Sequence, residues 1–281
     1  MYIDELWVRS HLPKRDNQTN KSSFGKLFAI IGSPMYRGAA RLALEAALRG
    51  GAGYTYVSSA PEVCDSLLQS FPEAIYRPIR GYGECEIPSD TSAVLLGCGC
   101  GTSLELAQLA ERTLSSSVPT VIIDADGINS IAKFCPDPQK VLTRVDKNVI
   151  ITPHPLEMAR LLGTSVDSVQ MQRERIAADF ANKTGVTVIL KGYHTVIAAP
   201  GKHMINTSGS SALAKAGSGD CLAGLLASLA ATALADAFTC AAIAAYVHGR
   251  AGDELESELS AYGVTPSDLP RKMAQVLASL S

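Results

Sequence analysis

Hydrophobic residues along this chain follow two spacings that alternate. Short β-branched runs predict buried strands over residues 27–31, 54–58, 93–97, 120–124 and 148–152. Between them, alanine and leucine recur at helical spacing and predict helices over 38–49 and 104–114. Because strands alternate with helices in this way, we expect an α/β protein with a mostly parallel central sheet and helices on both faces.

The later part of the chain has a different pattern. Residues 186–191 and 194–199 are both strand-like and are separated by Gly192 and Tyr193, which predicts a hairpin and an antiparallel edge. Further helices are predicted over 165–183, 220–235, 236–255 and 266–280. No internal repeat or low-complexity linker interrupts the chain, so we expect a single domain over residues 1–281, with residues 1–24 as an N-terminal extension.

Composition and charge narrow the class of protein. Apolar residues make up 47% of the chain and charged residues 19%, which is typical of a globular protein. The net charge is −2, from 25 Lys and Arg against 27 Asp and Glu, and no basic stripe is present, so we expect no nucleic-acid partner. The N-terminus has no signal-peptide pattern and the longest helical apolar run is shorter than a membrane span, so we expect no membrane association.

The seven cysteines are odd in number and several lie in apolar or glycine-rich runs. This usage indicates small core residues and a cytoplasmic, reducing location. Cys98 and Cys100 could form a redox or metal pair, but they are separated by one residue and no matching His or Cys cluster accompanies them, so a zinc site is not expected.

The turn Lys215-Ala-Gly-Ser-Gly-Asp220 is the most informative chemical feature. It opens an apolar helix, and the first N–H groups of a helix have no intrahelical partner, so the turn can bind an anion. A carboxylate beside bound phosphate would be repelled unless it has a task there. Removing the proton of a hydroxyl that attacks a phosphoryl group is one such task for Asp220. The alternative is an ordinary turn in which Asp220 is the N-cap.

Two further glycine-containing turns follow predicted strands. Gly38 and Ala39 open the helix after the first strand, and Gly97-Cys-Gly-Cys-Gly101 precedes another helix. Small residues and positive φ angles let a ligand approach the backbone at such places. Close helix packing at the first turn and a purely structural tight turn at the second are the alternatives.

Acidic and imidazole side chains stand at two other strand ends. Asp124 and Asp126 could hold magnesium, or Asp124 could cap backbone amides while Asp126 begins the next helix. His154 lies between two prolines that stiffen its loop, and we interpret it as a substrate contact rather than a structural histidine. Glu157 is either a first-turn helix acid or a magnesium-linked carboxylate. The metal ligands are therefore unknown, with Asp124 and Glu157 as candidates.

The segment Lys191-Gly-Tyr-His-Thr195 links the two strands of the predicted hairpin. Lys191 and Thr195 could grip a nucleotide phosphate as a point charge and a hydroxyl, and an exposed turn is the alternative. In parallel sheets, ligands bind beyond the carboxyl ends of the strands. All of these motifs fall at strand ends or strand–helix turns, so we expect one shared site.

In chain order these motifs resemble those of the ADP- or ATP-dependent NAD(P)H-hydrate dehydratases, a family of the ribokinase-like superfamily. Gly-x-Gly-Asp alone would indicate only the superfamily, whereas Thr-Pro-His-Pro together with Lys-Gly-x-x-Thr is specific to this group. The family usually has Gly-Pro-Gly-Leu-Gly where this chain has Cys98 and Cys100 between the glycines. The resemblance covers about residues 25–280 and rests on Ile31-Gly-Ser-Pro, Gly38-Ala39, Gly97-x-Gly-x-Gly101, Asp124-Ala-Asp126, Thr152-Pro-His154-Pro-x-Glu157, Lys191-Gly-x-x-Thr195 and Gly217-Ser-Gly-Asp220.

This resemblance implies a ribokinase-like three-layer sandwich and a metabolite-repair reaction. The hydrate of NAD(P)H carries a hydroxyl on C6 of its nicotinamide ring, and phosphoryl transfer from ADP or ATP would turn it into a good leaving group. The resemblance implies Asp220 as the base and Gly217, Ser218 and Gly219 as N–H donors to the transferred phosphoryl group. It further implies that the hydrated cofactor binds Ala39, Gly101, His154 and Asp220, and that the nucleotide binds Lys191, Gly192, Tyr193, His194, Thr195 and Gly219.

The resemblance also implies partners. ADP (or ATP) is the co-substrate, Mg²⁺ would neutralise the phosphates, and hydrated NADH or NADPH is the substrate. A homo-oligomer, a tetramer in this family, and a separate epimerase protein are expected, because 25 leading residues cannot hold the epimerase domain often fused to this module. Two other functions stay open: a ribokinase-like kinase for a small alcohol of the thiazole or pyrimidine type, and a non-catalytic nucleotide-binding protein.

Overall fold

The computed structural model describes residues 1–143 and 146–281. Ten strands of these residues form one sheet in the order β1-β10-β9-β8-β7-β6-β5-β2-β3-β4. The strands are β1 Tyr2–Ile3, β2 Lys26–Ile30, β3 Tyr54–Ser59, β4 Ile75–Pro78, β5 Ala93–Leu96, β6 Thr120–Ile123, β7 Asn148–Ile151, β8 Thr187–Leu190, β9 Val196–Ala199 and β10 Lys202–Asn206. The five strands predicted before residue 155 are all present, within one residue of their expected ends.

The sheet is parallel except at β9, which pairs antiparallel with both β8 and β10. The predicted hairpin is therefore confirmed. The edge on that side lies two strands further out, because β1 pairs parallel with β10 through Tyr2 and Ile3. Residues of the expected N-terminal extension thus complete the sheet.

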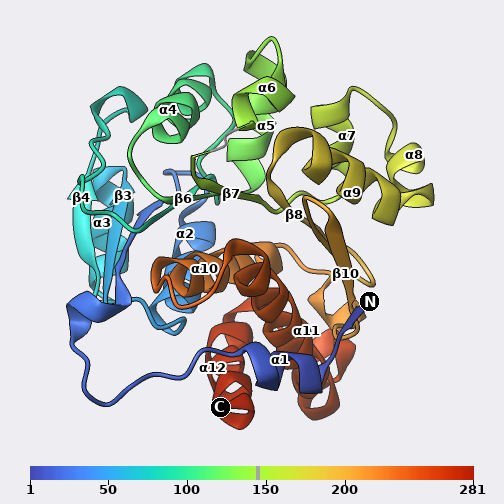
Figure 1. Cartoon of the computed structure of the whole chain (residues 1–281). Helices are drawn as coiled ribbons and strands as arrows, with labels where there is room; N and C mark the ends of the chain where they lie inside the picture. Colours follow the sequence, from blue (N-terminus) through green and yellow to red (C-terminus); the bar gives the residue numbers. More distant parts are fainter. Residues whose placement is uncertain (144–145) are drawn as a thin grey trace.

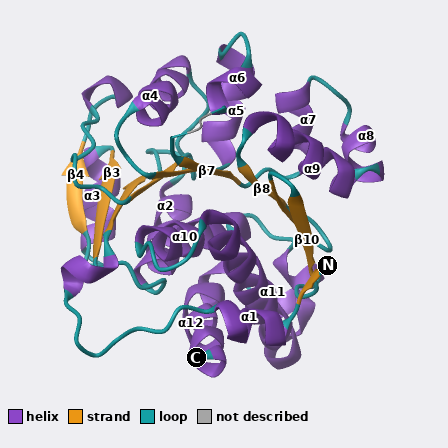
Figure 2. Cartoon of the chain, viewed as in Figure 1, coloured by secondary structure: helices purple, strands orange, loops and turns teal. Residues whose placement is uncertain are grey.

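Helices cover both faces of the sheet, which confirms the three-layer α/β sandwich (Figure 1 and Figure 2). The upper face in Figure 1 carries α4 Leu104–Ser115, α5 Ala125–Phe134, α6 Pro138–Leu142, α7 Pro155–Leu162, α8 Val166–Met171 and α9 Arg173–Thr184. The lower face carries α1 Glu5–His11, α2 Arg37–Leu48, α10 Ser218–Ala231, α11 Ala237–Gly263 and α12 Leu269–Leu280, and α3 Pro61–Leu68 packs beside α2. No helix of the described residues is long and apolar enough to span a membrane.

Alternation along the strands supplies two separate cores. In β2, Leu27 and Ala29 are buried with the helices of the lower face, whereas Phe28 and Ile30 are buried with those of the upper face. Because both faces are covered, the central strands are apolar at almost every position after their first residue.

The helix predicted over 165–183 is wrong as a single element. It is two helices, α8 and α9, separated at Gln172, whose φ of −136° and ψ of 37° are not helical. The residues on both sides of this break have helical spacing, so the sequence pattern alone does not reveal the break. The break makes Arg173 the first residue of α9.

Helix α10 lies against α2 with its backbone in direct contact. A Cβ at Gly224 would sit 2.0 Å from the Ala43 carbonyl oxygen, so only glycine fits there. This close contact fixes where α10 begins, and with it the turn at residues 217–220.

Candidate active site

A cavity of about 770 Å³ opens at the carboxyl ends of β6, β7 and β8, and we call it the carboxyl-end cavity. The loops after these strands, the start of α10 and one side of α11 form its walls. The site residues expected from the sequence that line it are Asp124, His154, Glu157, Lys191, Gly192, Tyr193, Thr195, Gly217, Ser218, Gly219 and Asp220. Ala39, Gly101 and His194 are not among its lining residues.

Gly217 sets the geometry of the turn before α10. It is the N-cap, with a φ of 101°, and a Cβ there would lie 2.5 Å from Leu42 Cδ1, so a side chain would be strained and would clash. Asp220 is therefore the third residue of the helix, and the alternative in which it is the N-cap is wrong. The Ser218 N–H donates to the Lys215 carbonyl oxygen (3.2 Å), while the N–H of Gly219 lies at the open helix start.

Asp220 is a buried carboxylate in an acidic setting. Burial, and then the nearby Asp124 carboxylate, raise its pKa to about 7, although the Lys191 ammonium opposes this. Ligand atoms of Asp220, Asp124 and the Cys98 thiol all lie within 4.8 Å of one another. A carboxylate with such a pKa can take up a proton near neutral pH, as a general base must.

Asp124 and Lys191 form a buried ion pair at the floor of the cavity. Asp124 Oδ1 accepts hydrogen bonds from Lys191 Nζ (2.9 Å) and Thr152 Oγ1 (2.5 Å), and the Cys98 thiol donates to Oδ2 (3.5 Å). Lys191 Nζ also lies 3.9 Å from Glu157 Oε2. Burial lowers the pKa of Lys191, but the two carboxylates outweigh it and leave that pKa raised, so the ammonium stays charged.

The structure settles the capping alternative for Asp124. Asp124 stands at the N-cap position of α5, yet its side chain makes no capping hydrogen bond, so the capping alternative is wrong. Its carboxylate instead holds a lysine that lies 67 positions away in the sequence.

His154 and Glu157 cap the start of α7 reciprocally. The Glu157 N–H donates to His154 Nδ1 (3.2 Å), and the His154 N–H donates to Glu157 Oε2 (2.8 Å). Burial, followed by Lys191, lowers the pKa of His154, so the imidazole is neutral at pH 7, and burial raises the pKa of Glu157. His154 thus has a structural role in addition to its place in the cavity wall.

The Gly97–Gly101 turn stands beside the cavity and is fixed by Asp126. The Asp126 carboxylate accepts from the Gly101 N–H (2.8 Å) and from Thr102 Oγ1 (3.1 Å), so Asp126 is a structural residue rather than a metal ligand. A Cβ at Gly99 would lie 2.6 Å from Ala39 Cβ, which places the start of α2 against the turn. Gly101, in contrast, has a φ of 78° and no atom near its Cβ position, so its surface is open to a ligand.

The two cysteines of this turn serve different partners. Cys98 donates to Asp124, whereas Cys100 donates to the Ile30 carbonyl oxygen (3.3 Å). Both thiols are buried, and burial raises the pKa of each. The redox or metal pair is therefore not formed between them.

Two residues of the site were missed in the sequence. His248, on α11, is buried and its Nε2 lies 3.0 Å from Ser218 Oγ, and burial lowers its pKa to about 4. Arg173 donates to the carbonyl oxygens of Leu190 and Tyr193, behind the loop that carries Lys191. The only signal for His248 is a polar residue within an alanine-rich helical run, and Arg173 gives none.

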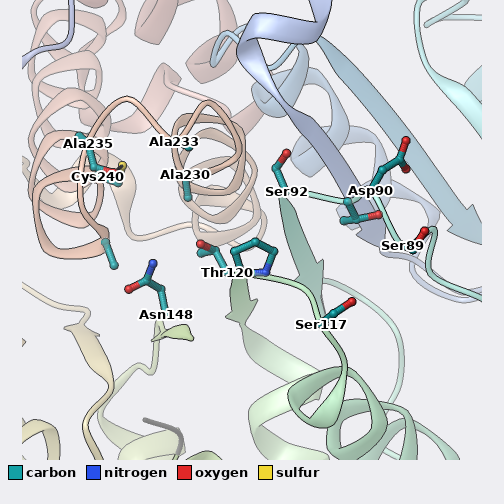
Figure 3. A pocket seen from close by; sticks show the side chains of 13 residues that line it. Ser89, Asp90, Ser92, Ser117, Thr120, Asn148, Ala230, Ala233, Ala235 and Cys240 are labelled. Carbon is teal, nitrogen blue, oxygen red and sulfur yellow. Dashed lines mark hydrogen bonds between the residues drawn. The ribbon is translucent and has the colours of Figure 1, made fainter. Parts of the chain in front are cut away.

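A second cavity, of about 520 Å³, lies at the opposite edge of the sheet, and we call it the amino-end cavity (Figure 3). Thr120 and Asn148 come from the starts of β6 and β7, and Ser92 precedes β5. Small side chains of α10 and α11, including Ala230 and Cys240, face them.

The chain has the fold of the ribokinase-like class of α/β proteins. Its cavity lies at the carboxyl ends of the parallel strands, where a glycine turn begins α10. The family model described as NAD(P)H-hydrate dehydratase matches residues 27–275. The chain belongs to that family.

Individual relatives agree with this assignment. The bifunctional NAD(P)H-hydrate repair enzyme of Moorella thermoacetica is 34% identical over 293 residues, covering 99% of this chain and 54% of that protein. The ADP-dependent (S)-NAD(P)H-hydrate dehydratase of Neisseria meningitidis is 34% identical over 245 residues, covering 86% and 81%. The chain thus spans about half the length of the bifunctional relatives.

A solved structure superposes on almost the whole of this chain. The ADP/ATP-dependent NAD(P)H-hydrate dehydratase of Bacillus subtilis, co-crystallised with ATP and Mg²⁺, superposes with a TM-score of 0.89 at 29% identity. The superposition covers 100% of this chain and 98% of that one.

Proposed function

We propose that this protein dehydrates (S)-NAD(P)H hydrate to NAD(P)H, consuming ADP or ATP. The observation that carries the proposal is the buried Asp220 carboxylate, whose pKa of about 7 suits a general base, beside the open start of α10. Family membership and the ADP-dependent relatives support the choice of substrate and nucleotide.

The proposed reaction begins at the C6 hydroxyl of the hydrated ring. Asp220 takes the hydroxyl proton as the oxygen attacks the terminal phosphorus of ADP, so that an O–P bond forms and the bond to AMP breaks. The ring nitrogen lone pair then expels phosphate from C6, and loss of a proton from C5 forms the double bond. The products are NAD(P)H, AMP and phosphate, so the water is lost as part of the phosphate.

Positive potential near Asp220 supports a phosphate subsite. Lys191 Nζ lies 3.4 Å from the Cβ position of Gly219, so the ammonium and the start of α10 meet at one place. We propose that Lys191, Thr195 and Gly219 bind the nucleotide phosphates there, with Gly217 shaping the turn. The Ser218 N–H, expected as a donor to the phosphoryl group, already donates to the Lys215 carbonyl oxygen. The Asp124 and Glu157 carboxylates would keep Lys191 charged and in position.

The hydrated cofactor is proposed to extend from Asp220 and His154 toward Ala39 and Gly101. The last two lie outside the carboxyl-end cavity but adjoin each other through the Gly97–Gly101 turn. The buried Cys98 of that turn donates to Asp124, so the turn adjoins the cavity at Asp124. Because His154 Nδ1 accepts from the Glu157 N–H, the neutral ring carries its proton on Nε2 and would donate a hydrogen bond to the ring substituents.

Magnesium is proposed to enter with the nucleotide, since Mg²⁺ binds through substrate phosphates and one or two carboxylates. Asp124 and Glu157 stay the candidate ligands: Asp124 already accepts from Lys191 and Thr152, and Glu157 from the His154 N–H, but each carboxylate keeps further lone pairs for the ion. The ion would supply charge neutralisation on the phosphates.

We also propose that residues 1–281 act as one domain and that the protein works in the cytoplasm as a homo-oligomer, with a separate epimerase supplying the S form. The seven cysteines are free thiols, which supports a reducing location.

An assay with four substrate pairs tests the function. Hydrated NADH and NADPH are each incubated with ADP or ATP, and recovery of dihydronicotinamide absorbance is followed together with AMP and phosphate. Recovery with at least one pair is expected. A stable phosphoester without recovered absorbance would show a small-alcohol kinase instead, and nucleotide binding without phosphate release would show a non-catalytic protein.

A further inference from the structure

The loop at residues 191–195, which we call the β8–β9 loop, is held in one shape by Arg173. The guanidinium donates to the carbonyl oxygens of Leu190 (3.0 Å) and Tyr193. It also lies against Gly192, where a Cβ would be 2.8 Å from Nη2, and the φ of 142° at Gly192 requires glycine as well. Thr195 Oγ1 donates to the Gly192 carbonyl oxygen (2.8 Å), which closes the loop from its other end.

Arg173 serves this loop rather than an ion pair. Burial lowers its pKa, although the neighbouring Glu174 carboxylate opposes this, and its Nε is buried without a hydrogen-bond partner among the described residues. Arg173 is half-buried, and its two hydrogen bonds to carbonyl oxygens hold the guanidinium against the β8–β9 loop.

The loop carries a stacked pair of rings at the rim of the cavity. The rings of Tyr193 and His194 have centroids 4.1 Å apart and planes 24° apart. Tyr193 lines the carboxyl-end cavity and is still 76% exposed. His194 adopts a left-handed conformation with a φ of 54°, which turns its ring back onto the tyrosine. One face of the tyrosine ring is therefore backed and the other face is free.

We propose that the free face of Tyr193 stacks on the base of the bound nucleotide, and that Arg173 is the positioning residue that holds it there. This rests on the proposed function, whose nucleotide phosphates lie at Lys191, two residues earlier in the same loop. A nucleoside diphosphate has a charged end and a flat aromatic end, and the β8–β9 loop offers a matching ammonium and ring. A purine base has the larger face, so the site should prefer purine over pyrimidine nucleotides.

Calorimetric titration of the wild-type protein and of Tyr193→Ala tests this, with ADP, CDP and inorganic pyrophosphate as ligands in the presence of Mg²⁺. The variant should bind ADP about tenfold more weakly, as loss of one stacked base does, and CDP should lose less. Pyrophosphate has no base, so its affinity should stay within about twofold. Tyr193→Phe should bind ADP like the wild type.

Arg173→Met should copy Tyr193→Ala. Lys191 is held independently by Asp124, so pyrophosphate binding should persist while the KM for ADP rises and kcat at saturating ADP is retained. Arg173→Lys should recover part of the ADP affinity. Tyr262→Ala, at a residue 95% exposed on α11, is the matched control and should change none of these values.

Unchanged ADP affinity in Tyr193→Ala, or equal losses for ADP and pyrophosphate, would overturn the stacking. Because binding is measured without turnover, the two proposals fail separately. A protein that shows the expected ADP losses but restores no reduced cofactor refutes the dehydratase and keeps the stacking.

Discussion

The two cavities lie at opposite edges of the same strands, yet they hold different chemistry. At the carboxyl ends of β6, β7 and β8, buried Asp220, Asp124 and Lys191 crowd together, and the pKa of Asp220 is raised. At the amino ends, Asp90 pairs with Lys26 in an exposed setting, and the Lys26 hydrogen bond lowers the pKa of Asp90. Burying a charged group costs folding free energy, whereas an exposed ion pair costs little. A cavity that holds buried charged groups is therefore the better candidate for a functional site.

Breaking the carboxyl-end cavity at its base should have the largest effect. Asp220→Asn keeps the shape but cannot take up a proton, so kcat should fall by roughly 10²–10⁴-fold, as for other lost general bases. ADP binding by calorimetry should persist. The control is Asp90→Asn in the amino-end cavity, which should leave kcat unchanged. Wild-type turnover in Asp220→Asn would move the base elsewhere.

Removing the Lys191 ammonium should have the next largest effect, which is on the stability of the folded protein. Lys191→Met leaves the buried Asp124 carboxylate without its partner, and the free energy of unfolding should fall by about 3–5 kcal/mol. Denaturant unfolding measures this. Lys26→Met removes the exposed partner of Asp90 and should leave the unfolding midpoint almost unchanged. Equal losses in the two variants would mean that burial does not distinguish the cavities.

The pH dependence separates the cavities further. An aspartate with a pKa near 4 when unfolded and about 7 when folded binds its proton more tightly in the folded state. Its contribution therefore lowers stability as pH rises from about 4 to 7, by at most about 4 kcal/mol. Asp220→Asn does not lose stability in this way, so its Tm should rise relative to the wild-type Tm as the pH increases from about 4 to 7. Wild-type activity should rise toward pH 7 as the base ionises. A Tm difference that is flat with pH would contradict the raised pKa.

The smallest effect is expected in the amino-end cavity. Asn148→Ala changes an exposed side chain at the start of β7, so unfolding free energy should move by no more than about 0.5 kcal/mol. Activity in the cofactor-recovery assay should match the wild type. A clear loss of activity would give that cavity a role that its side chains do not indicate.

The sequence predicted the layered fold and most of the cavity wall for a physical reason. Strand runs and glycine turns are local signals, and strand ends of a parallel sheet converge on one edge. The interactions that set the chemistry are not local. Asp124 and Lys191 pair across 67 positions, and Ser218 meets His248 across 30, so no spacing in the chain announces them.

Short elements escaped prediction for a related reason. Strand β1 has two residues, too few to show a period, and it exists because β10 offers a free edge. The break at Gln172 is likewise invisible in the helical pattern, although it puts Arg173 under the β8–β9 loop. Tertiary contacts determine short strands and helix breaks of this kind, whereas the local sequence pattern determines the longer elements.

The reversal at β9 has a consequence for how this site can vary. Because β8 and β9 are adjacent and antiparallel, residues 191–195 leave and re-enter the sheet at the same edge with no crossover helix between them. Residues 192–195 can be exchanged while Lys191, both anchoring strands and every helix stay in place, so that the buried Lys191–Asp124 pair is kept. Under the proposed function, nucleotide preference can therefore diverge, or be engineered by loop grafting, without remodelling the proposed base, Asp220.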